Sequence, residues 1–282
     1  MSDLRLVARQ DENHQSVIRI GNETIGGKEL CLIAGPCAVE SEQQLDEIAK
    51  GVSDLGIKFM RGGAYKPRTS PYAFQGLKKD GLRLLKNVSD KYGVKIVTEV
   101  LDTSLIEEVY PYADILQVGS RNAKNYAFLK ELGKLDKPIL LKRGMSSTIS
   151  EWLLAAEYIL LGGNENVILC ERGIRTFDTS VRNTMDIAAI PLAKELSHLP
   201  VIADPSQGTG KRSLVTPLSL AAIAAGADGL MIEVHNDPEE ALSDGFQSMY
   251  LNSMKEMVQV LKMQAELSGR SLDLKRIAAE VI

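Results

Sequence analysis

Short apolar runs alternate with longer amphipathic segments from about residue 30 almost to the end of the chain. The apolar runs cover residues 30–34, 57–60, 94–100, 115–118, 138–141, 167–169, 201–203 and 230–234. The segments after them have helical periodicity and cover residues 41–55, 76–92, 104–112, 122–132, 147–161, 179–196, 214–225 and 238–267. Eight buried strands, each followed by a helix, predict a (β/α)8 TIM barrel.

Local signals agree with this division. Ser41 and Gln44 have the spacing of a capping box at the start of a helix. Gly56, Gly93 and Gly133 stand where helices are expected to end. A doubly wound open sheet is the alternative, but eight units without a G-x-G-x-x-G opening favour a closed barrel.

Residues 1–29 are predicted to be an N-terminal extension. Alternating residues 16–20, the turn-like pair Gly21-Asn22 and residues 24–27 indicate a short β-hairpin. The extension is too short to form a domain of its own. Residues 30–282 are therefore expected to be one catalytic barrel, and the chain length of 282 suits a fold that takes roughly 250 residues.

Composition restricts the possible partners. A net charge of −4 argues against general nucleic-acid binding, so clusters of basic residues are better explained as sites for small anions. No apolar run approaches the ~20 residues that span a bilayer, and the N-terminus lacks the core of a signal peptide. Three cysteines do not indicate a disulfide framework. We expect a cytoplasmic protein without membrane contact.

The most basic stretch, RGGAYKPRTSPY at residues 61–72, directly follows a predicted strand. Glycines allow close approach of a ligand to the backbone, and prolines stiffen the loop. Arg68 offers a planar fork to a phosphate, whereas Lys66 offers a compact charge. A solvated basic loop is the alternative explanation of the cluster.

Cations also stand at the ends of other predicted strands. In a barrel the active site lies where the strands end, so these side chains are expected to converge. Convergence of cations in an acidic protein predicts a site for a polyanionic substrate. The strand-end residues include Arg61, Lys66, Glu99, Arg121, Lys142, Arg172, Asp204 and Glu233.

A second candidate constellation joins the first and last barrel units. Cys37 follows Gly-Pro at a strand end, and Glu233 and Asp244 follow the eighth strand. A thiolate with two carboxylates suits a divalent transition metal. Burial as a small apolar residue is the alternative for a cysteine, and it is the explanation we adopt for Cys31 and Cys170.

Several motifs in this order resemble 3-deoxy-D-arabino-heptulosonate 7-phosphate (DAHP) synthase of the short Iβ type. They are AGPCAVES, RGGAYKPRTSPYAFQGL, LLKRGMS, NVILCERGIRTF, DPS and IEVHNDPEEALSDG, and they extend from about Leu30 to Met249. The resemblance implies a transferase that condenses phosphoenolpyruvate with erythrose 4-phosphate at the start of the shikimate pathway of aromatic amino-acid biosynthesis. It also implies a homodimer or homotetramer. A 3-deoxy-octulosonate 8-phosphate synthase, acting on another aldose phosphate, is the alternative within the superfamily.

The resemblance also assigns roles to residues of this chain. The phosphoenolpyruvate ligands would be Arg61, Lys66, Arg121, Lys142 and Arg172. The aldose phosphate would be bound by Arg68, Thr69 and Asp204, and the catalytic groups would be Lys66, Cys37 and Glu99. The metal, Mn²⁺ or a similar divalent ion, would be bound by Cys37, Gln207, Glu233 and Asp244.

Gln207 departs from the family pattern, which usually has histidine after Asp-Pro-Ser. A glutamine carbonyl is a weaker donor to a transition metal than neutral imidazole. Gln207 therefore leaves three possibilities: a synthase with weakened metal binding, a low-activity variant, or a condensation on another aldose. A catalytically weakened protein that only binds sugar phosphates is the remaining alternative from a different functional class.

Overall fold

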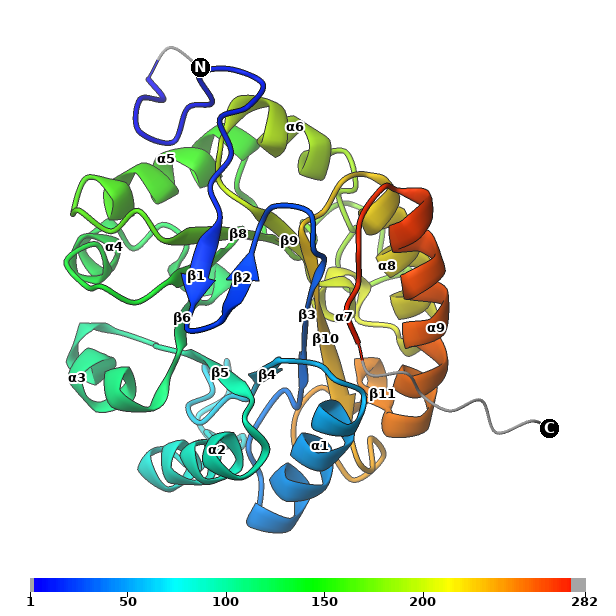
Figure 1. Cartoon of the computed structure of the whole chain (residues 1–282). Coiled ribbons are helices and arrows are strands. Elements are labelled where there is room, and N and C mark those ends of the chain that lie inside the picture. The colour runs from blue at the N-terminus through cyan, green and yellow to red at the C-terminus, as the bar shows by residue number, and fades with distance from the viewer. Residues whose placement is uncertain (1–2, 275–282) are drawn as a thin grey trace.

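Eight parallel strands close into a barrel in the computed structural model, which describes residues 3–274 (Figure 1). Each strand pairs with the next along the chain, and the last pairs with the first, so the expected (β/α)8 fold is confirmed. The predicted domain ran to residue 282, of which 275–282 lie outside the described residues. The barrel strands are β3 (Cys31–Gly35), β4 (Phe59–Arg61), β5 (Lys95–Glu99), β6 (Ile115–Val118), β7 (Ile139–Lys142), β8 (Val167–Glu171), β9 (Val201–Ala203) and β10 (Gly229–His235).

Helices surround the barrel and cover the outward faces of its strands (Figure 1). At the start of α1, the Ser41 side chain accepts from the backbone N–H of Gln44, as predicted. The Gln44 side chain instead accepts from Glu40, so only half of the expected capping box forms. The helices are α1 (Glu42–Asp54), α2 (Lys79–Tyr92), α3 (Ile106–Val109), α4 (Tyr126–Leu132), α5 (Ile149–Leu160), α6 (Ala189–Leu196), α7 (Pro205–Thr209), α8 (Arg212–Ala224) and α9 (Leu251–Leu267).

Two predicted helices begin ten or more residues later than expected. In the segment 179–196 only α6 is helical, and an isolated bridge joins Ile174 to Thr184 in the loop before it. In the segment 238–267 the helix α9 begins at Leu251, after a short strand β11 (Met249–Tyr250) beside β10. Asp244 has a left-handed φ of 56°, which an α-helix cannot include. The parts of both segments that precede these helices lie as loops at the end of the barrel where the predicted site residues meet.

The predicted hairpin forms and closes the other end of the barrel. Strand β1 (Ile18–Ile20) pairs antiparallel with β2 (Glu23–Ile25), and the turn is at Gly21-Asn22 as expected. In Figure 1 the hairpin lies in front of the barrel strands. Its three isoleucines, Ile18, Ile20 and Ile25, form one buried cluster with side chains from inside the barrel. The hairpin therefore supplies the apolar floor of the barrel, and the polar site is left at the opposite end.

The segment before the hairpin is fastened to the body of the protein by buried polar contacts. The Glu157 carboxylate on α5 accepts backbone N–H groups of Arg5, Leu6 and Val7. His198 contacts the Leu6 carbonyl through Nε2 at 2.8 Å and the Ser16 hydroxyl through Nδ1 at 2.7 Å. Burial lowers the pKa of His198, so its neutral form belongs to the folded protein.

Stability is expected to fall as the pH is lowered from about 7 to about 5. The folded-state pKa of His198 lies below its ordinary value of about 6.5, so the unfolded chain binds the proton more readily in this range. Its contribution is fully present above about pH 6.5 and is lost as the pH falls toward the folded pKa. Urea unfolding midpoints at several pH values measure this loss, and His198→Gln should reduce its size. An unchanged slope in that variant would assign the loss to other groups.

Within residues 3–274, no helix combines the length and the apolar character needed to cross a bilayer.

Candidate active site

A cavity of about 360 Å³ opens at the carboxyl ends of the barrel strands. Most of the predicted site residues meet there, although they come from seven different barrel units. Cys37 lies beside it and lines a small second cavity with Arg61, Lys66 and Glu99. The main cavity is lined by Arg61, Lys66, Pro67, Arg68, Thr69, Ser70, Ala73, Glu99, Gln117, Gly119, Ser120, Arg121, Lys142, Met145, Arg172, Arg182, Gln207 and Asp244.

Glycine makes the loop after β4 possible. A Cβ atom at Gly63 would lie 2.6 Å from the carbonyl oxygen of Cys37 and 2.8 Å from Cδ of Lys66. Both distances are shorter than real contacts, so a side chain here would push the two candidate catalytic residues apart. With glycine, the Lys66 ammonium reaches Cys37 and donates to both its carbonyl and its sulfur at 3.0 Å.

Buried ion pairs hold the cations at the bottom of the cavity. Lys142 Nζ lies 2.6 Å from Asp204 Oδ2, and Arg61 Nη1 lies 3.1 Å from Glu233 Oε1. Burial by itself raises the pKa of Asp204, but Lys142 and Arg61 outweigh it and hold that pKa below its ordinary value. Asp204 is therefore an anion that orients Lys142. The sequence analysis had predicted Asp204 to be a ligand of the aldose phosphate. Asp204 does not itself line the cavity.

Arg61 keeps hydrogen-bonding capacity for a ligand. Its side chain is buried, and its Nη1 is close enough to Glu233 for an ion pair. Nevertheless, within the described chain its Nε and Nη1 atoms form no well-aligned hydrogen bond. A buried guanidinium with unused donors is costly unless an anion completes its hydrogen bonds.

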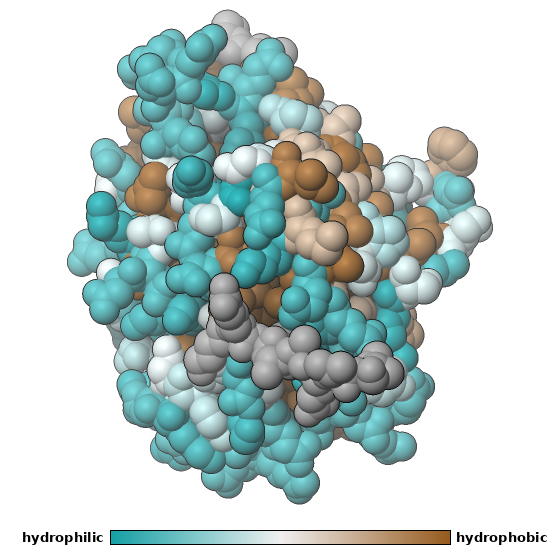
Figure 2. Space-filling model, turned by 45° about the vertical axis from the view of Figure 1, so that its right-hand side comes forward, coloured by the Kyte–Doolittle hydropathy of each residue, from teal (hydrophilic) through white to brown (hydrophobic). Residues whose placement is uncertain are grey.

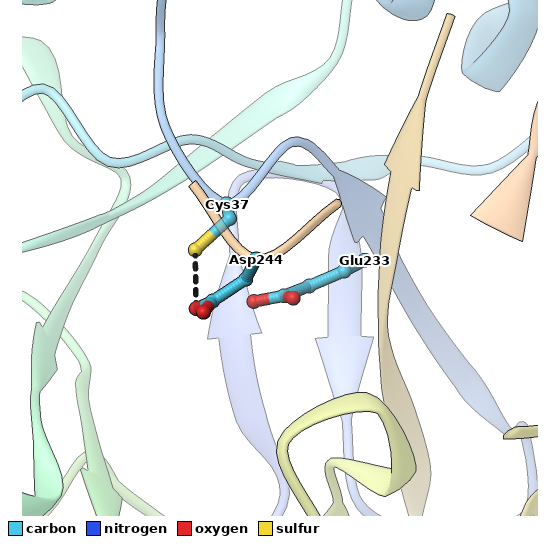
Figure 3. Close-up of side chains that lie close together, drawn as sticks. All are labelled: Cys37, Glu233 and Asp244. Atoms are coloured by element: carbon cyan, nitrogen blue, oxygen red, sulfur yellow. Dashed lines mark hydrogen bonds between the residues drawn. The ribbon is translucent and has the colours of Figure 1, made fainter. Parts of the chain in front are cut away.

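Cys37, Glu233 and Asp244 converge from the first and last barrel units, as Figure 3 shows. One potential ligand atom from each lies within 4.8 Å of the others, and Cys37 Sγ is 3.1 Å from Asp244 Oδ2. Burial, and to a smaller extent Glu233, raise the pKa of the Cys37 thiol to about 12, although Lys66 acts to lower it. A divalent ion would favour the thiolate, so the three donors fit such an ion in number, type and spacing.

Gln207, the fourth predicted ligand, presents a different atom to this cluster. Its amide nitrogen donates to Glu233 Oε1 at 2.8 Å and to Asp244 Oδ2 at 3.3 Å. Its amide oxygen accepts from Arg172 Nη2 at 3.0 Å. The side chain therefore turns its N–H group, and not its carbonyl oxygen, toward the two carboxylates.

Of the three residues predicted to bind the aldose phosphate, Arg68 and Thr69 lie nearer the cavity mouth, whereas Asp204 is buried. Thr69 is exposed, and Arg68 donates to the Ser243 hydroxyl at 2.8 Å. Arg121 is also exposed at the rim, whereas Lys142 and Arg172 are buried. The cations are thus divided between a deep group and a rim group.

Three residues of the site were missed by the sequence analysis. Arg182 lines the cavity and pairs with Asp244 Oδ1 at 3.2 Å. Gln247 is fully buried and donates to Glu233 Oε2 at 2.6 Å, and Ser243 joins Arg68 to Cys37 Sγ. All three lie in the two segments that were predicted to be helical, so no strand-end signal marked them.

Comparison with known proteins identifies the family to which the chain belongs. The sequence matches the DAHP synthetase I family over residues 9–268. A phospho-2-dehydro-3-deoxyheptonate aldolase from Thermotoga maritima is 52% identical over 265 residues, which cover 94% of this chain and 78% of the relative. A 2-dehydro-3-deoxyphosphooctonate aldolase from Francisella tularensis subsp. mediasiatica is 33% identical, and the match covers 87% of this chain and 95% of that protein.

Solved structures give the same result. A crystal structure of the Thermotoga maritima DAHP synthase superposes with a TM-score of 0.93 at 50% identity, covering 96% of this chain and 79% of that one. A truncated form of the Thermotoga maritima 3-deoxy-D-arabino-heptulosonate 7-phosphate synthase gives a TM-score of 0.89 at 47% identity, covering 96% and 99%. The chain is a (β/α)8-barrel aldol-type synthase. It belongs to the DAHP synthetase I family, which confirms the resemblance found in the motifs.

Proposed function

We infer that this protein condenses phosphoenolpyruvate with erythrose 4-phosphate to form DAHP and inorganic phosphate, the first step of the shikimate pathway. Family membership and the 52% identity to a DAHP synthase carry this inference. The two reactants bring two phosphates and a carboxylate together, so the site must offset strong mutual repulsion. The convergence of buried and rim cations in one cavity meets that requirement.

The deep cations are proposed to bind phosphoenolpyruvate. Lys142 and Arg172 are buried, and Arg61 has unused donors, so a small anion with a phosphate and a carboxylate would complete their hydrogen bonds. Arg121 at the rim and Lys66 would contact the same substrate from the other side. Glu99, whose Oε2 accepts from Gln117 at 3.3 Å, is proposed to accept or donate a proton in this pocket.

The bond-forming step joins C3 of phosphoenolpyruvate to the aldehyde carbon of erythrose 4-phosphate; water adds at C2 of phosphoenolpyruvate, and its phosphate leaves. Lys66 is proposed to place its ammonium at the reacting end of the cavity, since it contacts Cys37 and lines both cavities. Although burial by itself lowers the pKa of Lys66, Cys37 and Glu99 raise it above its ordinary value, so the group is a cation. A cation there stabilises negative charge on the aldehyde oxygen as the bond forms.

Cys37, Glu233 and Asp244 are proposed to be ligands of a divalent ion such as Mn²⁺. The ion would supply Lewis-acid polarisation of the aldehyde. Binding through these residues is expected to be weak, because Gln207 would have to rotate its amide before its oxygen could become a ligand.

The assay is phosphoenolpyruvate consumption in the presence of erythrose 4-phosphate, with and without added Mn²⁺. Four- and five-carbon aldose phosphates compared side by side distinguish DAHP synthesis from the octulosonate reaction of the 33% identical relatives. Preference for the five-carbon substrate would replace the proposed substrate. Phosphoenolpyruvate binding without turnover on any aldose would favour the catalytically weakened alternative.

Arg68→Ala is expected to raise KM for erythrose 4-phosphate at least tenfold and to leave phosphoenolpyruvate binding nearly unchanged. A charge-assisted phosphate contact contributes about 1.5–3 kcal/mol, and 1.4 kcal/mol is a factor of ten. Arg83→Ala, at an exposed position on α2, removes the same charge away from the cavity and should change neither value. Equal losses for both substrates would show that Arg68 is not selective for the aldose.

A homodimer or homotetramer in the cytoplasm is proposed. Figure 2 brings the α8 and α9 side forward, and apolar side chains gather on part of that face. On α9, Val260, Met263 and Leu267 follow helical spacing and are 39%, 64% and 83% exposed. Grouped apolar side chains on one helix face are typical of association surfaces. A monomeric mass by light scattering at micromolar concentration would contradict this proposal.

A further inference from the structure

The Gln207 side chain is fixed from both ends. Its amide nitrogen donates to Glu233 and Asp244, and its amide oxygen accepts from Arg172. The backbone of the same residue is held as well: its N–H donates to Asp204 Oδ1 at 2.9 Å, and its carbonyl accepts from Asn183 Nδ2 at 3.1 Å. The Gln207 amide is therefore held in one orientation by hydrogen bonds within the site.

The orientation of this amide follows from its neighbours. A guanidinium can only donate hydrogen bonds, so the atom facing Arg172 must be the oxygen. Ionised carboxylates can only accept, so the atom facing Glu233 and Asp244 must be the nitrogen. The reversed amide would place oxygen against two anions and N–H against a cation. The assignment of the two ends is thus fixed by hydrogen-bonding chemistry.

The carboxylate oxygens of the cluster are already satisfied by donors of the chain. Glu233 Oε1 accepts from Gln207 and faces Arg61, and its Oε2 accepts from Gln247 at 2.6 Å. Asp244 Oδ1 accepts from Arg182 at 3.2 Å, and its Oδ2 accepts from both Cys37 and Gln207. Only Gln207 contacts both carboxylates among these donors. Glu233 is buried and Asp244 is half-buried, and two anions placed this close need such a bridge.

We propose that the Gln207 amide replaces a divalent cation as the group that holds Glu233 and Asp244 together. This inference extends the proposed function, since it concerns the same cluster. Three consequences follow: the cluster is organised without an ion, an ion must first displace the Gln207 N–H group, and that displacement breaks the contact with Arg172. Metal binding and the Gln207 bridge are therefore mutually exclusive.

Co²⁺ tests the proposal, because a cobalt–thiolate bond gives an intense charge-transfer absorption that needs no turnover. After treatment with a chelator, the full-length protein is expected to give little of this absorption when titrated with Co²⁺. Gln207→His offers an imidazole ligand and removes the bridge, so we expect one equivalent of Co²⁺ with at least tenfold higher affinity. Adding Cys37→Ala to that variant should abolish the absorption.

Gln207→Met removes the bridge and offers in its place only a thioether, a much poorer ligand for Co²⁺ than imidazole. Its melting temperature should fall, and Co²⁺ should restore part of the loss, because an ion that binds only the folded state stabilises it. Gln247→Met is the matched control, since Gln247 donates to Glu233 but not to Asp244. The control is expected to lose stability without being rescued by Co²⁺, because the Gln207 bridge still excludes the ion.

Tight binding of one Co²⁺ by the unmodified protein, with full thiolate absorption, would overturn the proposal. So would equal rescue of both methionine variants. If Gln207→Met does not fold, the proposal is tested by the cobalt–thiolate absorption of Gln207→His compared with that of the unmodified protein. Failure of the condensation assay would reject the proposed function without affecting these measurements, which detect only the ion and the folded state.

Discussion

Lys66→Met is expected to lower kcat for the condensation by about 10²–10³-fold, the usual effect of removing one preorganised donor at a reacting oxygen. The ammonium reaches the centre of the site because Gly63 leaves room for its side chain. Methionine has similar length and no charge, so the loss measures the cation and not the packing. Steady-state kinetics with both substrates varied gives kcat separately from each KM.

Two further variants show whether position or charge matters. Lys79→Met removes an exposed lysine at the start of α2 and should leave kcat unchanged. Lys66→Arg retains the positive charge, but a planar guanidinium cannot occupy the position of a compact ammonium, so it should recover little activity. Substantial recovery with arginine would mean that Lys66 acts only through its general charge.

Asp204→Ala is expected to lower the free energy of unfolding by about 3–5 kcal/mol, the range for breaking a buried ion pair. Asp204 is fully buried, so its removal leaves the equally buried Lys142 without its counter-ion 2.6 Å away. The same carboxylate also accepts from the backbone N–H of Gln207 at the start of α7. Urea unfolding followed by circular dichroism measures the loss.

Asp204→Asn separates these two roles. Asparagine can still accept at the helix start, a contact worth about 1 kcal/mol, but it cannot neutralise Lys142. The asparagine variant should therefore be only slightly more stable than the alanine variant. If it were as stable as the unmodified protein, the ion pair would contribute nothing and the capping contact would account for the whole effect.

Periodicity was sufficient to predict the barrel, because both apolar strands and amphipathic helices leave a local signal. The same periodicity predicted helices wrongly in segments whose side chains contact residues of the site instead of packing in the core. Arg182 and Asn183 turn toward Asp244 and Gln207, and Asp244 adopts a left-handed backbone. These are long-range contacts, and no local pattern of apolar residues records them.

Strand-end position also could not separate neighbours of the same charge. Lys142 lines the cavity, whereas the adjacent Arg143 pairs with Glu171 and Asp186 and does not line it. Successive side chains of a strand point to opposite faces, so a shift of one residue changes the role of a cation. That a basic side chain stands at the end of β7 was predictable, but which of the two adjacent basic side chains faces the cavity depends on the register of the strand.

The β1–β2 hairpin affects how far the protein can be shortened. Gly26 lies beside Pro200, just before β9, and Gly21 lies beside Lys95 at the start of β5, so the hairpin covers strand beginnings on both sides of the barrel. A version that started at residue 30 would expose Ile33, Ile115 and Ile202 of the inner cluster to water. For a minimal catalytic unit, the β1–β2 hairpin therefore counts as part of the interior, and removing it invites aggregation.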